Sequence, residues 1–156
     1  MSKRILLSSG LFSVMLAFVL SSCTDCMQGN GKMATRSAKF SEVTAINLSL
    51  SADVILVADS TGNVKIEGES NIIEAIILEQ NGTRLRITSE PCISSNKPIT
   101  ISIPMKTVSD LQINGSGSIR SGNKMSSSDL ELGINGSGDI DIDVNAANVI
   151  SKINGS

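Results

Sequence analysis

The chain has 156 residues, a formal net charge of −2, and neither histidine, tyrosine nor tryptophan. It therefore lacks the commonest acid–base catalyst and metal ligand, and most of the aromatic rings on which sugars and bases often stack. Nucleic-acid binding requires clustered lysine and arginine, so this mildly acidic chain without a basic run excludes nucleic acid as a partner.

Residues 1–22 are typical of a secretory signal peptide, because Lys3 and Arg4 precede an apolar run that is short for a membrane-spanning helix. The closing Leu20-Ser21-Ser22-Cys23 resembles the lipobox of bacterial lipoproteins, in which the cysteine thiol is acylated and becomes the first mature residue. This resemblance implies a lipid anchor on Cys23 in the cell envelope. We expect the outer membrane, and the sequence does not decide between its periplasmic and its surface face. The alternative is an ordinary signal peptide followed by a chance cysteine.

Residues 23–38 are poor in apolar residues and rich in Gly, Ser, Asn and Lys, which is typical of a tether. We therefore expect the folded domain to span 39–156. Cys26 and Cys92 would reach an oxidising compartment, where disulfides form. The sequence leaves both a bridge between them and unpaired thiols open, because it supplies no geometry.

Period-two alternation of apolar residues predicts half-buried strands at Ile46–Leu50, Val64–Glu67 and Ile99–Ile103. The continuous apolar run Val54–Val57 instead predicts a strand in the middle of a sheet, covered on both faces. Asn71–Leu78 suits either a helix or a strand, and we expect one helical turn at its start.

Asn81-Gly82 follows that segment and precedes the strand residues Leu85 and Ile87. This dipeptide is the strongest short-range hairpin signal, because both turn residues tolerate positive φ. We therefore predict a β-hairpin here.

A repeated motif dominates the C-terminal third of the chain. Gln112–Ile119 (QINGSGSI) returns as Gly133–Ile140 (GINGSGDI) and begins again as Lys152–Ser156 (KINGS). A repeat of about 20 residues is typical of a solenoid in which each copy supplies one coil. The apolar residues predicted to face the core of these coils include Ile113, Ile134 and Ile142.

Two sets of residues recur at the turns of these repeats. The glycines mark corners where a Cβ would obstruct a positive φ or close stacking: Gly115, Gly117, Gly136 and Gly138. Stacked coils would also bring three side-chain amides into a hydrogen-bonded ladder: Asn114, Asn135 and Asn154.

These motifs resemble a known family. The paired Ile-Asn-Gly-Ser-Gly-x-Ile motifs, Gly133-Ile134-Asn135, the opening Phe40-Ser41-Glu42-Val43, the Asn81-Gly82 hairpin and Lys97-Pro98-Ile99 are similar to the auto-transporter adhesin head GIN domain. The resemblance covers 39–156. It implies an all-β fold, namely a right-handed β-helix with a strand-rich N-terminal half, in exported or lipid-anchored proteins common in Bacteroidetes. It implies no catalytic residue and no cofactor.

Asp139, Asp141 and Asp143 lie on one face of an alternating strand and faintly resemble the calcium-binding turns of β-rolls. The alternative is a solvated strand face, because period-two alternation already requires polar residues there. The preceding copy has Ser118 and Arg120 at the places of Asp139 and Asp141, which favours the solvated face and no metal.

We predict a non-catalytic binding or adhesin-like module with a glycan or protein ligand at the cell surface. The alternatives are a structural envelope module without a specific ligand and a glycan-active β-helix enzyme, which the lack of sugar-stacking aromatics disfavours. Family domains usually run through more coils, and the last motif breaks off at Ser156. We therefore expect a shortened family member that self-associates through an open coil edge or is poorly stable alone. The alternative is a final segment that folds back and caps the coil.

Overall fold

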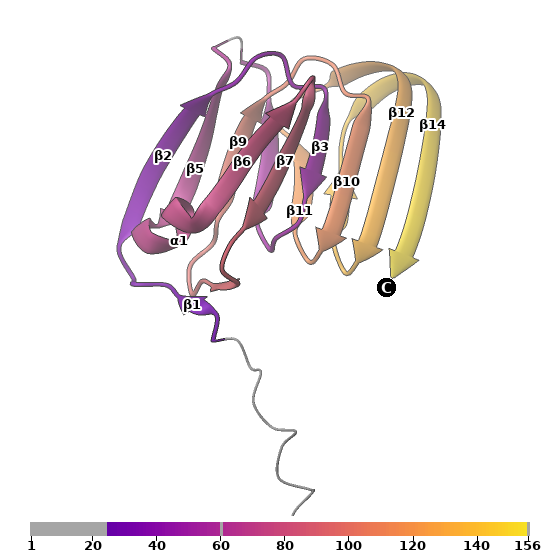
Figure 1. Ribbon diagram of the computed structural model, residues 1–156. Helices are drawn as coiled ribbons and strands as arrows, with labels where there is room; N and C mark the ends of the chain where they lie inside the picture. The colour runs from indigo at the N-terminus through magenta and orange to yellow at the C-terminus, as the bar shows by residue number, and fades with distance from the viewer. Residues whose placement is uncertain (1–24, 60, 156) are drawn as a thin grey trace, which may run out of the picture.

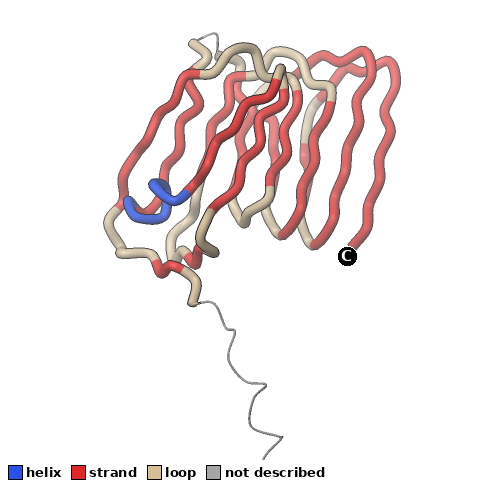
Figure 2. Tube along the Cα trace, in the orientation of Figure 1, coloured by secondary structure: helices blue, strands red, loops and turns tan. Residues whose placement is uncertain are grey.

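Figure 1 shows the computed structural model, which describes residues 25–59 and 61–155. Two six-stranded β-sheets pack face to face around one aliphatic core, and only one short helix is present among the described residues (Figures 1 and 2). In their order across the first sheet, the strands are β14 (Val144–Gly155), β12 (Met125–Gly136), β10 (Asp110–Gly115), β3 (Ala45–Leu48), β7 (Arg84–Ser89) and β6 (Ile76–Asn81). In the second sheet they are β13 (Asp139–Asp141), β11 (Ser118–Ser121), β4 (Asp53–Val57), β9 (Thr100–Pro104), β5 (Asn63–Glu69) and β2 (Met33–Lys39).

The expected all-β class is confirmed, and both sheets are mixed. Parallel pairing runs through β7-β3-β10-β12-β14 in the first sheet and through β9-β4-β11-β13 in the second. Antiparallel strands flank these ladders, because β6 pairs with β7, and β5 lies between β9 and β2. The structure therefore shows mixed sheets, and the right-handed β-helix stays a prediction.

The order of the strands in space differs from their order along the chain. β3 and β4 come early in the sequence, yet they lie in the middle of the two sheets. The chain first adds β7 and β9 on one side of them, and then crosses to add β10 and β11 on the other side (Figure 1). Nothing in the local sequence pattern signals this crossing.

The repeated motifs pair in register, as their self-similarity requires. Ile113 lies opposite Ile134, and Ile134 opposite Ile153. Their burial decreases outwards, because Ile113 is fully buried, Ile134 is half-buried and Ile153 on the edge strand is 67% exposed. Ile142, also expected in the core, is half-buried and packs against it. A coil at the edge has a neighbour on one side only, so the same residue gains less burial there.

β4 lies centrally in its sheet, but it is not covered on both faces. Val54 and Leu56 are fully buried between the sheets, whereas Ile55 and Val57 are only half-buried on the outer face. The prediction of two-sided burial is wrong because the domain has two layers, so that each sheet has one core face and one outer face.

The segment after β5 begins with the expected helical turn, α1 (Ser70–Ala75), which buries Ile72 and Ile73, and it continues as β6. The predicted hairpin joins β6 to β7. Asn81 pairs with Arg84, so the turn consists of Gly82 and Thr83, and Gly82 has a φ of 60°.

The predicted tether is wrong for residues 33–38, because β2 pairs with β5 along its full length. The sequence pattern did not indicate a strand here, because β2 is a polar edge strand whose large apolar residue, Met33, is 57% exposed. Such a strand is held by backbone hydrogen bonds and by short half-buried side chains such as Ala34 and Ala38. β1 (Met27–Gln28) also pairs in parallel with β8 (Ile93–Ser94).

The predicted signal peptide (1–22) and the predicted acylation site, Cys23, lie outside the described residues. Within those residues, no helix has the length and hydropathy needed to cross a membrane.

Candidate functional site

One end of the domain carries the repeated Asn-Gly-Ser-Gly turns and the short strands β1 and β8 (Figure 1). We call it the turn end. Gly115 and Gly136 adopt positive φ angles of 137° and 131°. Gly117 and Gly138 are needed for close packing, since a Cβ would lie 2.6 Å from Leu48 in the first case and 2.6 Å from Ile113 in the second. The two expected roles are thus divided between Gly115 and Gly117 in the first motif. Gly136 in the second motif combines them, because a Cβ there would also lie 2.5 Å from the Gly115 carbonyl oxygen.

A ladder of side-chain amides runs along the first sheet above these turns. Asn114 Nδ2 donates to Asn47 Oδ1, Asn135 Nδ2 to Asn114 Oδ1, and Asn154 Nδ2 to Asn135 Oδ1, each at 3.1 Å. The sequence repeats predict the last three members. They missed Asn47, although its Ile46-Asn47 dipeptide repeats the Ile-Asn of the later copies.

The N-terminal segment is fastened to the turn end. A disulfide joins Cys26 to Cys92, which resolves the alternative that the sequence leaves open. The backbone of Met27 donates to the carbonyl of Cys92 at 2.8 Å. Asn71 Nδ2 donates to the carbonyl of Gln28 at 2.7 Å, and Asn71 Oδ1 accepts from the backbone of Asn30 at 3.0 Å.

Glu69 completes this attachment from the end of β5. Its buried carboxylate accepts hydrogen bonds from Gly31 N at 2.6 Å, Ser95 Oγ at 2.7 Å and Asn96 N at 3.1 Å. The Ser95 hydroxyl and these backbone donors lower the pKa of Glu69, although burial opposes them. We call the disulfide together with the contacts of Asn71 and Glu69 the N-terminal lock. No sequence pattern points to Glu69, because one acidic residue at the end of a strand is ordinary.

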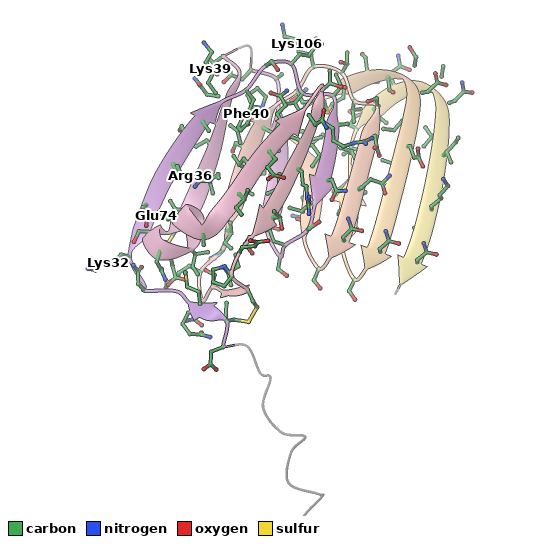
Figure 3. The ribbon with its side chains drawn as sticks, in the orientation of Figure 1. Lys32, Arg36, Lys39, Phe40, Glu74 and Lys106 are labelled. Atoms are coloured by element: carbon green, nitrogen blue, oxygen red, sulfur yellow. A yellow bond between two sulfur atoms is a disulfide. The ribbon has the colours of Figure 1, made fainter. Side chains whose placement is uncertain are left out.

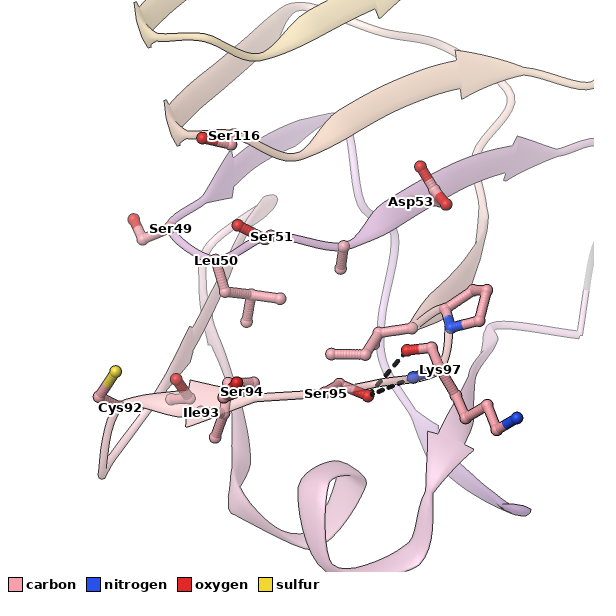
Figure 4. A pocket seen from close by; sticks show the side chains of 14 residues that line it. Ser49, Leu50, Ser51, Asp53, Cys92, Ile93, Ser94, Ser95, Lys97 and Ser116 are labelled. Carbon is pink, nitrogen blue, oxygen red and sulfur yellow. Dashed lines mark hydrogen bonds between the residues drawn. The ribbon is translucent and has the colours of Figure 1, made fainter. Parts of the chain in front are cut away.

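A groove of about 800 Å³ borders the lock at the turn end (Figure 4). Three chain segments form its walls: the β3–β4 loop, the connection from β7 to β9, and the β10–β11 turn through Ser116. Its apolar lining comprises Leu50, Ala52, Ile93, Pro98 and Ile99. Its polar lining comprises Ser49, Ser51, Asp53, Ser89, Ser94, Ser95, Lys97 and Ser116.

Most of the groove's hydroxyls are available to a ligand. Ser49 Oγ donates to Asn47, and Ser95 Oγ is bound to Glu69 and the Lys97 carbonyl. Within the described part of the chain, four lining hydroxyls have no hydrogen-bond partner: Ser51, Ser89, Ser94 and Ser116.

The two charged residues of the groove are Asp53 and Lys97. The ammonium of Lys97 forms no ion pair with any described residue. One carboxylate oxygen of Asp53, Oδ1, accepts from Ser118 Oγ at 2.6 Å. The groove therefore offers hydroxyls, one cation, one anion and an apolar floor to a ligand.

A second pocket of about 430 Å³ lies at the opposite end of the domain. It is lined by Phe40, which is the one aromatic residue of the described chain, and by Lys39 and Lys106, which project from this end in Figure 3. Glu42 and Asp59 also line it, so it carries charges of both signs. Its volume is smaller, and the hydroxyls that line it among the described residues, those of Ser41 and Thr61, both have hydrogen-bond partners, so it is the weaker candidate.

The three candidate calcium ligands do not assemble a metal centre. Asp139, Asp141 and Asp143 are exposed along β13 and the loop after it. Asp139 lies beside Ser118, and Asp141 beside Arg120. Over residues 25–59 and 61–155, no three acidic, cysteine or histidine side chains are grouped closely enough to hold a metal ion.

Several solved bacterial proteins share the fold. A putative lipid binding protein from Parabacteroides distasonis ATCC 8503 has a TM-score of 0.68 and 21% identity over 85% of this chain and 63% of its own. A putative adhesin from Bacteroides fragilis NCTC 9343 has a TM-score of 0.62 and 20% identity over 83% and 62%. A putative adhesin from Parabacteroides merdae ATCC 43184 has a TM-score of 0.62 and 14% identity over 84% and 65%. The chain thus spans less than two thirds of each of these proteins.

No curated protein matches the chain. The model of one protein family, the putative auto-transporter adhesin, head GIN domain, matches residues 42–156. This match covers all three repeated motifs and every strand of the two six-stranded sheets except β2. The chain therefore belongs to the putative auto-transporter adhesin, head GIN domain family.

Proposed function

We propose that this protein is a lipid-anchored, exported protein of the cell envelope that acts as a non-catalytic, adhesin-like binding module. The observation that carries the proposal is the groove at the turn end, where three loops converge and four hydroxyls have no partner among the described residues. Loops that a rigid scaffold holds in place are where binding residues concentrate. Membership of an adhesin-head family and the adhesin and lipid-binding descriptions of similar structures support a binding role.

Two parts of this proposal concern assembly. The in-register parallel ladders of the repeats support a solenoid-like stacking of coils, in which β12 and β14 continue the pattern set by β10. Val149, Ile150 and Ile153 on the edge strand β14 are more than half exposed. An exposed apolar edge strand favours pairing with another strand, so self-association through β14 belongs to the proposal.

The anchor is tested on Cys23. The parent protein should partition into detergent and carry the mass of a lipid, and the Cys23→Ala variant should do neither. If the variant partitions and weighs as the parent does, apart from the substitution, the anchor is wrong.

Binding is tested with the purified chain on immobilised glycans and on host-surface proteins, with an unrelated lipoprotein as control. We expect a signal that the control lacks and that persists in the presence of a chelator. A chain that binds no more than the control favours the alternative, a structural envelope module without a specific ligand. Turnover of a bound glycan would instead favour the glycan-active enzyme.

A further inference from the structure

The groove lies at the end of the domain that is nearest along the chain to the proposed anchor. Cys26 is disulfide-bonded to Cys92, which itself lines the groove. Cys23 precedes Cys26 by three residues, and three extended residues span at most about 11 Å. Acylation of Cys23 would therefore hold the turn end, and the groove with it, beside the membrane surface. The expected tether of 23–38 would have allowed the domain to project much further.

The lining of the groove matches the chemistry of a sugar. Each serine hydroxyl can donate one hydrogen bond and accept two, and Ser51, Ser94 and Ser116 reach the groove from three different segments. Leu50 and Ile99 form an apolar floor between them. A sugar ring presents hydroxyls at its edge and C–H groups on its faces, so it can use both parts of this lining.

The charges of the groove favour a neutral ligand. Lys97 and Asp53 carry opposite charges, so the lining has no net charge. A phosphate group is usually bound by clustered cations or by a bidentate arginine, and the described residues that line the groove include a single lysine and no arginine.

We propose that this groove binds the neutral sugar head group of a glycolipid in the membrane to which the protein is anchored. The inference rests on the proposed function for the position of the groove, and on the groove's own lining for the class of ligand. The same hydroxyl chemistry would accept a free glycan, so the experiment below separates the two sources.

Binding of one sugar here should be weak, because none of the described residues that line the groove is an aromatic residue on which a sugar can stack. Anchoring compensates for weak affinity. A second, tethered binding event occurs at an effective concentration on the order of millimolar, so a weak site beside the membrane can still be occupied.

The two consecutive copies of the turn provide a matched pair of variants. Ser116 lines the groove, and its repeat equivalent, Ser137, is exposed on the next coil and does not line it. Ser116→Trp should fill the groove, and Ser137→Trp should leave it open. Ser51→Trp, at an exposed position of the β3–β4 loop, is a second blocking variant if Ser116→Trp fails to fold.

The probe is a set of phosphatidylcholine vesicles with or without an equimolar mixture of glucosyl, galactosyl and mannosyl diacylglycerol. The chains carry Cys23→Ser, so that co-sedimentation reports the groove and not the acyl chain. The vesicles therefore supply head groups at a concentration on the order of millimolar, which replaces the effective concentration that anchoring would provide. We expect sedimentation with the glycolipid vesicles only, at least a fivefold loss of bound protein for Ser116→Trp or Ser51→Trp, and no loss for Ser137→Trp. Equal binding to plain vesicles, no binding to either, or an equal loss in all three variants would overturn the proposal.

The free methyl glycosides of the same three sugars separate the two sources. We expect a small rise in Tm at high sugar concentration that Ser116→Trp lacks and Ser137→Trp retains. The variants are needed because sugars also stabilise proteins by exclusion from the surface. Binding to the free glycosides without binding to the vesicles would overturn the head-group assignment. Neither the vesicle assay nor the glycoside assay uses acylated protein. Their outcome therefore tests sugar binding by the groove independently of whether Cys23 carries a lipid.

Discussion

The two halves of the domain are stabilised in different ways. The N-terminal half combines parallel and antiparallel pairing with the N-terminal lock, and it buries Ile46, Leu56 and Ile101 completely. The C-terminal half repeats one motif, and the burial of equivalent residues falls from Ile113 to Ile153. The difference shows that a repeat sets the register of its strands, whereas its contribution to stability depends on how many neighbours cover it.

The largest expected effect on stability follows the decrease in burial from Ile113 through Ile134 to Ile153. Truncating a fully buried isoleucine to alanine typically costs about 2–5 kcal/mol, so Ile113→Ala should lower the free energy of unfolding by that amount. Ile134→Ala should cost less, and Ile153→Ala less than about 0.5 kcal/mol, as for an exposed residue. Denaturant unfolding of the three variants measures the order, and an equal or reversed order would contradict the gradient.

The lock should have the next largest effect. The disulfide closes a separation of 66 residues, and such bridges typically contribute about 2–4 kcal/mol by constraining the unfolded chain. The double variant Cys26→Ser and Cys92→Ser should lose stability in this range, and amide exchange should quicken in β1 and β8 before it does in β12. Unchanged stability would mean that the contacts of Asn71 and Glu69 hold the segment alone.

A smaller effect should depend on pH. The pKa of Glu69 is lowered in the folded state, chiefly by the Ser95 hydroxyl and then by backbone donors. Its contribution to stability is therefore fully present above the ordinary glutamate pKa of 4.5, and is lost as the pH falls from there through the lowered pKa of the folded state.

Glu69→Gln should flatten this part of the stability profile, measured as Tm against pH. The exposed Glu42→Gln, at the opposite end of the domain, is the matched control and should retain the parent's acid-induced loss. A Glu69→Gln profile that is parallel to the parent's would show that this carboxylate is not responsible.

The smallest effect is expected on the outer face of the repeats. Asp141 is exposed, and Asp141→Asn should change stability by no more than about 0.5 kcal/mol. Addition of Ca²⁺ should leave the Tm of both proteins unchanged. A larger loss than that of Ile134→Ala, or a Ca²⁺-dependent rise in Tm, would reveal a bound metal on this strand.

The features of the fold that depend on local sequence could be predicted, and those that depend on distant segments could not. Period-two patterns, the Asn81-Gly82 hairpin and the register of the repeats depend on local chemistry, and the structure shows each of them. The strand β2 was missed because a polar edge strand needs a partner backbone and not an apolar pattern. The crossing of the chain beyond β9 was missed because no local residue records it.

The site was harder to predict than the fold. The repeats indicated the turns that carry Ser116 and the amide ladder. The groove also needs Ser51 and Ser94, which come from segments without a motif, and the lock that borders it needs Glu69 and the pairing of Cys26 with Cys92. Such sites arise from the convergence of distant segments, and a single sequence does not record which segments meet.

The position of the groove relative to the membrane tests the central claim most directly. Single thiols introduced as Ser116→Cys at the turn end and Lys106→Cys at the opposite end can each carry a fluorophore on the acylated protein, with Cys26 and Cys92 protected in their disulfide. With nitroxide-labelled lipid in the vesicles, we predict strong quenching of the fluorophore at position 116 and weak quenching at position 106. Equal quenching at the two positions, or stronger quenching at position 106, would contradict a domain held with its groove at the membrane.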